Sequence, residues 1–299
     1  MTITTRFLRR TLHSLDDGLR TLRSVRKSTI AARFAVALGC AFGAAGAAAQ
    51  QELTLGVSEG TSGGLDHGRV IAKYGPLADA IGKALGRKVQ VVFAREFSAL
   101  DEGLRSGRFD LAMARPSDYP ARAIRDQRYQ FVASAKPEGQ CLVVVREDSP
   151  MRSIADAKGK RWVLPEGVSY MSKFCAAELR DRGIKVGAEK VQYVREQGAV
   201  TFYLEQQFAD VGGIASYSGV AKGLEKAKLR VLHRSVSQPY FPLVASPRLT
   251  AEQVRAVQAE LTALPQTDAG RAVLRTVGIE AFDTASGPRL RALLAWLEG

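Results

Sequence analysis

Short apolar runs typical of β-strands alternate with amphipathic helical patterns over most of the chain, and this alternation restricts the fold more than any other feature. Leu53–Ser58 alternates between apolar and polar residues as a half-buried strand does, and Val89–Phe93 is a strong β-type run. Between them, the apolar residues of Pro76–Leu85 recur at four-residue steps, which predicts a helix ended by Gly86. This strand–helix–strand order predicts an α/β fold with a largely parallel sheet.

The alternation continues through two consecutive sets of elements and ends in a helical tail. The rest of the first set is expected to contain a helix over Ser98–Gly107 and strands over Phe109–Ala114 and Tyr129–Ala135. The second set is expected to contain strands over Leu142–Val145, Arg161–Leu164, Lys190–Val194, Asp210–Ile214 and Leu229–Leu232, and helices over Ser153–Ala157, Ser169–Gly183, Gly198–Gln207 and Ser216–Gly223. The tail is expected to form helices over Ala251–Leu264, Ala269–Val277 and Pro288–Leu297. Pro242 interrupts the strand pattern of Tyr240–Ala245, so this strand is expected at an edge or a crossover.

Residues 1–49 have the pattern of an export signal. The first 33 residues carry eight Lys and Arg, and Phe34–Ala49 is an apolar stretch that is too short to span a bilayer comfortably. This stretch ends in Ala47-Ala48-Ala49, an A-x-A cleavage pattern, so the mature chain is expected to begin at Gln50 or the next residue and to work in the periplasm. A membrane-anchoring helix and a lipoprotein attached through Cys40 are the alternatives.

The charge of the processed chain is moderate. Removal of residues 1–49 takes away eight basic and two acidic residues, which lowers the net charge from +13 to +7. The remaining positive residues are scattered along the chain, a distribution that does not favour nucleic-acid binding. It fits a mildly basic cleft for an anionic solute, although a solvated surface also explains most of these charges.

Few residues of the kind used in catalysis remain after processing. The only histidines are His67 and His233, and no cluster of His, Cys and carboxylates has the spacing of a metal site. A Gly-x-Ser-x-Gly nucleophile motif is absent, and the Gly-rich stretch Glu59–Gly68 lacks the Lys-Ser/Thr of a P-loop. The sequence therefore predicts a binding protein without metal or cofactor rather than an enzyme.

Two cysteines, Cys141 and Cys175, remain in the processed chain. An exported chain with two cysteines can close one disulfide. Cys141 begins an apolar strand pattern, and Cys175 lies in the first turns of the helix predicted over Ser169–Gly183. Spacing does not decide whether they meet, so a disulfide and two free buried thiols are both open.

Arg161–Arg180 (RWVLPEGVSYMSKFCAAELR) has the pattern of a strand, a short loop and a helix. Pro165 closes the strand, Gly167 supplies a turn, and Ser169 stands at the N-cap position before the apolar-periodic run. The unpaired N–H groups of a helix start and the helix dipole favour an anionic or strongly polar group. Ser169 is therefore interpreted either as a simple helix cap or as part of an anion-binding site.

Ligands of parallel α/β sheets bind outside the carboxyl ends of the strands. This rule brings five loops to one cleft, namely Glu59–Gly68, Ala94–Phe97, Arg115–Tyr119, Glu166–Ser172 and Ala215–Tyr217. Arg115 is interpreted as a bidentate ligand of a carboxylate or phosphoryl group, the alternative being a salt bridge to Asp118 or Glu59. The other candidate ligand-binding residues, each with a surface or packing role as the alternative, are Glu59, Thr61, Ser62, Arg95, Tyr119, Ser169, Tyr170, Ser172, Ser216 and Tyr217.

A family resemblance is carried by eight short stretches. They are Tyr74–Asp79, Leu85–Val89, Leu104–Ala112, Val143–Ser149, Ile154–Lys160, Ala209–Gly213, Gly270–Leu274 and Val277–Ile279. In this order they resemble the phosphate/phosphite/phosphonate-binding (PhnD-like) branch of type II periplasmic solute-binding proteins. The resemblance implies mixed, mostly parallel sheets in two lobes joined by two crossover strands, near Gln140 and Tyr240. Lobe 1 would comprise residues 50–137 and 242–299, and lobe 2 residues 138–241.

The same resemblance implies a function. A small anionic solute, phosphonate-like, phosphate-like or a carboxylate, would be captured between the lobes by hinge closure and presented to the permease of an ABC transporter. The protein is expected to be a monomer. A periplasmic sensor component that signals ligand occupancy to a membrane kinase is the alternative.

The binding residues of the family carry over in part. Its Ser-Thr-Ser-Gly helix cap is replaced by Gly167–Tyr170, in which Ser169 keeps a hydroxyl and Ser172 compensates for another. Ala215–Tyr217 stands where the family has an acidic residue, and Gln197 stands in place of its histidine. The loss of that carboxylate argues against an amino-bearing ligand such as an aminoalkylphosphonate.

Overall fold

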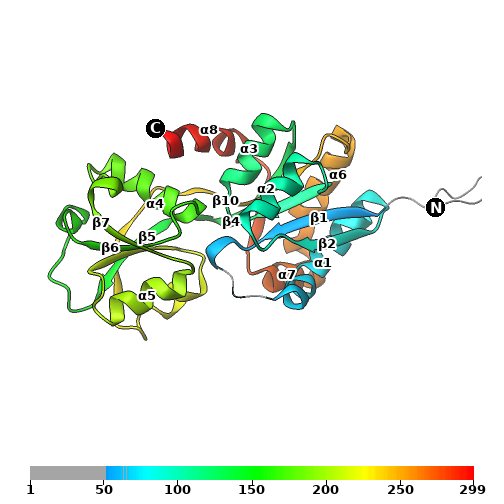
Figure 1. Cartoon of the computed structure of the whole chain (residues 1–299). Coiled ribbons are helices and arrows are strands. Elements are labelled where there is room, and N and C mark those ends of the chain that lie inside the picture. Colours follow the sequence, from blue (N-terminus) through cyan, green and yellow to red (C-terminus); the bar gives the residue numbers. More distant parts are fainter. Residues whose placement is uncertain (1–51, 63, 65) are drawn as a thin grey trace, which may run out of the picture. The chain divides into compact units, whose positions relative to one another are not determined.

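Residues 52–62, 64 and 66–299 are described by the structure, which is a computed structural model (Figure 1). They form two mixed β-sheets with helices packed against both faces. The export-signal prediction for residues 1–49 and its alternatives lie outside the described residues. Within the described part of the chain, no helix is long and apolar enough to cross a membrane.

The first sheet has six strands in the order β11-β4-β10-β3-β1-β2. Their bounds are β1 Leu53–Ser58, β2 Val89–Phe93, β3 Leu111–Ala114, β4 Gln130–Gly139, β10 Gln238–Ala245 and β11 Ala281–Asp283. β1 is parallel to β2 and β3, whereas β10 is antiparallel to β3 and β4, and β11 is antiparallel to β4. The sequence did not predict β11.

The second sheet has five strands in the order β7-β6-β8-β5-β9. Their bounds are β5 Cys141–Arg146, β6 Arg161–Pro165, β7 Lys190–Val194, β8 Val211–Ala215 and β9 Leu229–Arg234. β6 is parallel to β7 and β8, and β5 is antiparallel to β8 and β9. The α/β prediction is confirmed, but the sheets are less parallel than expected because β4, β5 and β9–β11 run against their neighbours.

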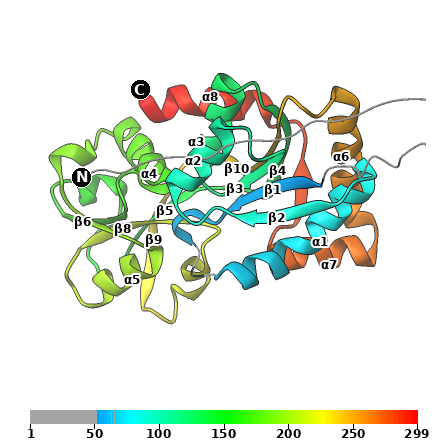
Figure 2. The same ribbon diagram turned by 45° about the vertical axis from the view of Figure 1, so that its right-hand side comes forward.

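Two segments carry the chain between the sheets (Figures 1 and 2). The first lies at Gln140, between β4 and β5, and the second at residues 235–237, between β9 and β10. The sequence placed the second crossover near Tyr240, which instead pairs with Ala135 inside the first sheet. We call the parts built on the six-stranded and the five-stranded sheet the first and the second lobe. Their residue boundaries remain a prediction.

Pro242 lies in β10, an interior strand, and a β-bulge accommodates it. β10 advances from Tyr240 to Leu243 while its partner β4 advances by only two residues, so β10 holds one extra residue there. Phe241 takes up the distortion with a left-handed φ of 50°. Because bulged residues leave the regular ladder, the missing N–H of Pro242 is tolerated. Neither sequence-based alternative holds, because β10 is an interior strand and the crossover lies before it, at residues 235–237.

Helices lie on both faces of each sheet. Their bounds are α1 His67–Leu85, α2 Phe97–Arg105, α3 Asp118–Asp126, α4 Tyr170–Asp181, α5 Gln197–Glu205, α6 Ala251–Ala263, α7 Asp268–Val277 and α8 Gly287–Glu298, with 3-10 turns η1 Gly60–Ser62, η2 Ile154–Ala157, η3 Val186–Ala188, η4 Gly219–Gly223 and η5 Leu264–Gln266. On the first sheet, α1, α6 and α7 share one apolar cluster, and α2 and α3 share another. On the second sheet, Val143 packs with α4 and Val144 with α5, because successive strand residues face opposite sides.

Three local predictions are wrong. The loop predicted over Glu59–Gly68 contains η1 and the start of α1, because the Asp66 side chain caps that helix by accepting a hydrogen bond from the N–H of Arg69 (2.8 Å). The loop predicted over Arg115–Tyr119 runs directly into α3. The helix predicted over Ser216–Gly223 is only the short turn η4.

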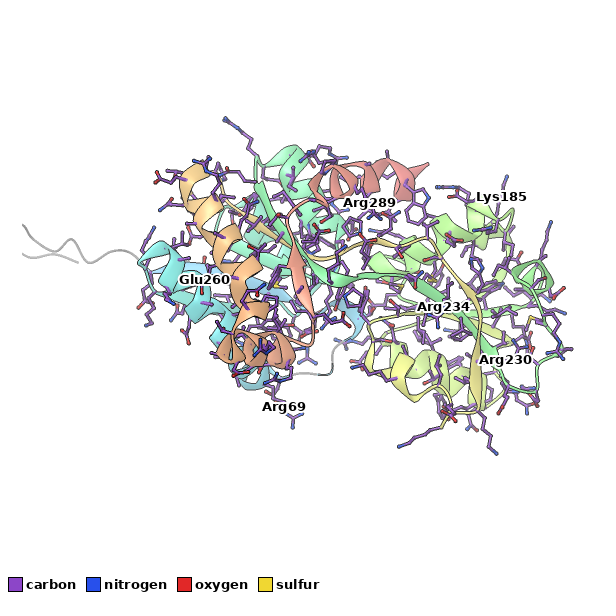
Figure 3. All side chains as sticks on the ribbon, turned by 180° about the vertical axis from the view of Figure 1, so that it is seen from behind. Arg69, Lys185, Arg230, Arg234, Glu260 and Arg289 are labelled. Atoms are coloured by element: carbon purple, nitrogen blue, oxygen red, sulfur yellow. A yellow bond between two sulfur atoms is a disulfide. The ribbon has the colours of Figure 1, made fainter. Side chains whose placement is uncertain are left out.

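Charged side chains are spread over both lobes. Figure 3 labels Arg69 on α1, Lys185 after α4, Arg230 and Arg234 on β9, Glu260 on α6 and Arg289 on α8. These positions belong to different elements, in keeping with the scattered charges of the sequence.

Candidate functional site

Two neighbouring cavities lie where the loops of both sheets meet. The inner cavity has a volume of about 10 Å³ and the outer one about 70 Å³, and they share Glu59, Gly60, Thr61 and Phe97 as walls. Each of the five predicted loops contributes a lining residue, for example Arg95 to the outer cavity and Arg115, Tyr170 and Tyr217 to the inner one. We call both cavities together the cleft. Its inner part holds about one water molecule, so this structure represents closely apposed lobes.

Glu59 and Arg115 meet in the cleft because of strand register. β1 and β3 are parallel neighbours in which Ser58 pairs with Ala114, so the next residues leave the sheet side by side. Glu59 is 4% exposed, and its carboxylate forms an ion pair with Arg115 Nε. The sequence-based alternative of a salt bridge between Arg115 and Glu59 is therefore what the structure contains.

Two residues of α1 also bind Glu59. Glu59 Oε1 accepts hydrogen bonds from the Tyr74 hydroxyl (2.5 Å) and from Lys73 Nζ (2.7 Å). Burial alone would raise the pKa of Glu59, but Arg115 and Lys73 lower it below its usual value. The sequence pattern predicted this helix only from Pro76 onward, so it did not indicate Lys73 and Tyr74 as site residues.

Arg115 is also enclosed by aromatic rings. Its guanidinium carbon lies 4.8 Å from the ring centre of Phe241, 5.3 Å from that of Tyr240 and 5.6 Å from that of Tyr217. Burial would lower the pKa of Arg115, but the Glu59 carboxylate raises it, so the group stays charged. Arg115, Lys73 and Glu59 together carry one net positive charge at this end of the first lobe.

The start of α4 faces the cleft from the second lobe. Ser169 is the N-cap, as predicted, and its hydroxyl accepts a hydrogen bond from the Ser172 N–H at 3.2 Å. Ser169, Tyr170 and Met171 line the inner cavity. The first N–H groups of a helix have no acceptor within it, so those of Tyr170 and Met171 are donors available to a ligand.

Thr61, Gln197 and Tyr217 bring the lobes into contact. Gln197 Nε2 donates to Thr61 Oγ1 (3.3 Å), while its Oε1 accepts from the N–H of Ala215 (2.7 Å). The Tyr217 ring stacks on that of Tyr240 with centroids 3.9 Å apart. Gln197, which replaces the family histidine, was not among the predicted site residues, although its place in the resemblance was a signal.

The remaining candidates lie outside the inner cavity. Tyr119 stacks on Phe97 (6.0 Å between centroids) and lines neither cavity. Ser216 accepts a hydrogen bond from the Gln140 N–H (3.1 Å), so it holds a crossover segment instead of facing the cleft. Ser172 is buried behind Ser169. Ser62 ends η1, and its side chain is outside the described part of the structure.

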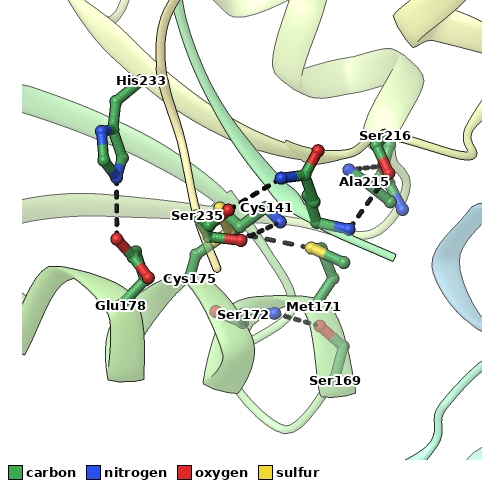
Figure 4. The surroundings of a disulfide bond; sticks show 12 residues. Cys141, Ser169, Met171, Ser172, Cys175, Glu178, Ala215, Ser216, His233 and Ser235 are labelled. Carbon is green, nitrogen blue, oxygen red and sulfur yellow. Dashed lines mark hydrogen bonds and ion pairs between the residues drawn. A yellow bond between two sulfur atoms is a disulfide. The ribbon is translucent and has the colours of Figure 1, made fainter. Parts of the chain in front are cut away.

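A disulfide joins Cys141 to Cys175, with Cα atoms 5.4 Å apart (Figure 4). It links the first residue of β5, next to the crossover at Gln140, to the second turn of α4. One turn later Glu178 accepts hydrogen bonds from His233 (2.8 Å) and from the Val236 N–H (3.1 Å). Both crossover segments are therefore tied to the helix whose first turn lines the cleft.

Among the described residues, no group of three or more His, Cys, Asp or Glu side chains is arranged to hold a metal ion.

Comparisons with known proteins agree with this architecture. Residues 64–289 match the family described as "ABC transporter, phosphonate, periplasmic substrate-binding protein". A Xanthomonas citri protein bound to a chloride ion superposes with a TM-score of 0.67 at 18% identity, covering 83% of this chain and 97% of that chain. PhnD1 of Prochlorococcus marinus in complex with methylphosphonate gives 0.65 at 13% identity, covering 82% and 96%.

A third structure, the binding-protein component of an ABC phosphonate transporter from Pseudomonas aeruginosa, gives a TM-score of 0.63 at 17% identity, covering 83% of this chain and 85% of that chain. At these identities the likeness concerns the fold, which is the type II periplasmic binding fold, as expected from the sequence.

Proposed function

Because the chain belongs to the family of periplasmic substrate-binding proteins of phosphonate ABC transporters, we propose that its cleft binds a small phosphonate-like, phosphate-like or carboxylate anion through the start of α4. Proteins of this family are transport proteins that bind a solute for an importer, and they are not an enzyme family. The proposal concerns the chemical class of the solute and the residues that hold it.

The observation that carries the proposal is the meeting of a capped helix start with a positively charged group in one cleft. Tyr170 and Met171 supply N–H donors in the first turn of α4, and Ser169 orders that turn. On the first-lobe side of the inner cavity, Arg115 pairs with Glu59, and Lys73, which lines neither cavity, pairs with the same carboxylate, so these three side chains carry one net positive charge. An anion between them would interact favourably with both sides.

Arg115 has a supporting role in this proposal. Its Nε is already held by Glu59 and its planar face is covered by aromatic rings, so it supplies a fixed positive charge. The anion is instead held by backbone N–H groups, which have fixed directions and favour small oxyanions.

Calorimetry tests the proposal with methylphosphonate, inorganic phosphate, methanesulfonate and acetate as probes. Ser169→Ala should weaken binding of the preferred anion by roughly 2- to 30-fold, because loss of the N-cap that orders this turn costs about 0.5–2 kcal/mol. Thr267→Ala is the matched control, since Thr267 caps α7 in the same way, by accepting from the Gly270 N–H (3.0 Å). Equal affinities in the two variants, or no binding of any probe, would contradict the proposal.

Export, the monomeric state and the permease complex belong to the same proposal. An exported chain cleaved after Ala49 or Gln50 should give a periplasmic form that begins at Gln50 or Gln51, which N-terminal sequencing reads directly. Light scattering of this form should give the mass of one chain.

A further inference from the structure

The disulfide lies one helical turn behind the residues that are proposed to bind the anion. Met171 lines the inner cavity, and its Sδ atom is 3.7 Å from the Sγ atom of Cys175 (Figure 4). Residues four apart share one face of an α-helix. Because a helix rises 1.5 Å per residue, the bridged residue is only about 6 Å along the axis from Met171. The bond therefore holds α4 close to the N–H donors of its first turn.

The other end of the bridge is a fixed point of the second sheet. Cys141 begins β5, which lies between β8 and β9, and it pairs with Ala215 of β8. On its other side, the N–H of Cys141 donates to Ser235 Oγ (2.8 Å), and its carbonyl accepts from the Ser235 N–H (2.9 Å). Since hydrogen-bonded segments flank Cys141 on both sides, this residue is a firm anchor for α4.

The bridge also lies where α4 approaches the sheet most closely. A Cβ at Gly213 of β8 would lie 2.9 Å from Cys175 Sγ and 2.7 Å from a methyl carbon of Leu164, so the sulfur fills the space over this glycine. Close packing restricts α4, but the burial of apolar surface is non-directional, whereas a disulfide requires a specific geometry. The bond therefore limits sliding of α4 along the sheet more sharply than packing does.

Other directional contacts of α4 belong to its second half. Glu178 accepts hydrogen bonds from His233 (2.8 Å) and from the Val236 N–H (3.1 Å). Asp181, the last residue of α4, accepts from the indole N–H of Trp296 (2.7 Å). Among the described directional contacts between α4 and the second sheet, the disulfide is therefore the one nearest the first turn.

We propose that the Cys141–Cys175 disulfide is a positioning element of the solute site. It holds the N–H donors of Tyr170 and Met171 where a bound anion meets them, so the affinity for the solute depends on this bond, and not only the stability of the lobe. The inference rests on the proposed function, because it concerns the helix start that is proposed to hold the anion.

The physical reason is the short range of hydrogen bonds. An N–H donor at about 2.9 Å from its acceptor no longer forms a proper hydrogen bond after a shift of roughly 1 Å. Binding residues therefore need support that holds them to within about 0.5 Å. In α4 this support is a covalent bond one turn behind the donors.

Calorimetry on the periplasmic chain tests the inference, with methylphosphonate or, if it binds more tightly, inorganic phosphate. Three forms are compared, namely the oxidised protein, the same protein refolded in reductant, and Cys141→Ala with Cys175→Ala. Both cysteines are buried, so the reductant is present during refolding. The two forms without the bond should bind at least about fivefold more weakly, which corresponds to part of one hydrogen bond to a charged group. Circular dichroism checks that each form is folded.

Leu204→Ala is the matched control for general destabilisation of the second lobe. Leu204 is fully buried in the cluster on the α5 side of the second sheet, opposite α4. Removal of its side chain destabilises the lobe and leaves the contacts of α4 in place. The affinity of this variant should stay within about twofold of the wild type.

Hydrogen exchange measured by NMR adds a test that needs no ligand. The N–H groups of Ser172 and Lys173 are bonded to the hydroxyl and the carbonyl of Ser169 (3.2 and 3.1 Å). Without the disulfide, these two N–H groups should exchange at least about fivefold faster, because local opening of the helix start becomes easier. The Gly270 N–H, which is bonded to Thr267 at the start of α7 in the first lobe, should keep its rate.

The outcomes separate this inference from the proposed function. If both forms without the disulfide bind within twofold of the oxidised protein, the inference is wrong. An equal loss of affinity in Leu204→Ala also overturns it, because general destabilisation would then be the cause. If the oxidised protein binds no probe, the proposed function fails instead. Hydrogen exchange still decides in that case, since unchanged rates at Ser172 and Lys173 show that the bond does not position the helix start.

Discussion

Removal of the Cys141–Cys175 disulfide should lower the free energy of unfolding of the second lobe by about 4 kcal/mol. The two cysteines are 34 residues apart, and both are fully buried. A cross-link that closes a loop of this length restricts the unfolded chain, and the chain-entropy relation gives about 4 kcal/mol at 25 °C. The native state gains nothing comparable from reduction, because the two sulfur atoms remain enclosed between β5 and α4.

Chemical denaturation is measured on the oxidised protein and on the same protein refolded in the presence of a reductant, and the two free energies of unfolding are compared. Fluorescence of Trp162 is the reporter, because this residue is 1% exposed and packs in the same cluster as both cysteines. A Trp296→Phe background removes the second tryptophan signal. The reduced protein should unfold at a lower denaturant concentration without a matching change in the slope.

A cysteine-free variant, Cys141→Ala with Cys175→Ala, is the control. Reductant should not change the free energy of unfolding of this variant. The variant should be at least as destabilised as the reduced protein, because it also loses both sulfur atoms from a packed core. If reductant shifts the wild-type free energy by less than about 1 kcal/mol, the loop-closure argument fails for this bond.

Three further substitutions test the packing of the first lobe by denaturation. Glu59→Gln should cost about 3–5 kcal/mol at pH 7, because it leaves Arg115 buried beside Lys73 without a countercharge. Since the folded pKa of Glu59 is below 4.5, its contribution is complete above that pH and is lost as pH falls through the folded pKa, so the acid limb of the pH–stability curve should flatten in the variant. Gly270→Ala should destabilise by about 1–3 kcal/mol, because a Cβ there would lie 2.0 Å from a backbone oxygen of Leu264; a neutral effect would show that α7 can shift freely. Gly75→Ala, in the interior of α1, adds a Cβ that meets no atom outside its chain neighbours and its own helix, but Pro76 crowds the Cβ of the residue before it; the propensity gain of about 0.5–1 kcal/mol should therefore be offset, and a gain of full size would contradict this crowding.

The sequence predicted a helix or strand correctly where the pattern or capping residue lies within that element itself. The strand β1 was expected over the residues that form it, and Ser169 was expected at the N-cap it occupies. The helix α3 was missed because Pro116 and Pro120 made its start resemble a loop, although proline is tolerated in the first turn of a helix. The first half of α1 was missed because Gly68, Gly75 and the interior Pro76 all disfavour a helix.

The sequence also predicted the general position of the site, but it did not predict whether Arg115 pairs with Glu59 there. The rule that strand ends share one edge of a sheet brought five loops together, and all five line the cleft. Whether Arg115 would face a ligand or Glu59 depended on the register of β1 against β3, which no local pattern encodes.

The order of apolar and polar residues by itself determined the α/β class, the capped start of α4 and the set of loops that could form a cleft, because these depend on periodicities within single elements. Only the tertiary structure decided that Cys141 meets Cys175, that Glu59 neutralises Arg115, and that α8 packs against α4. Each of these contacts joins residues far apart in the sequence, so it depends on strand order and helix packing that arise only when the whole chain buries its core.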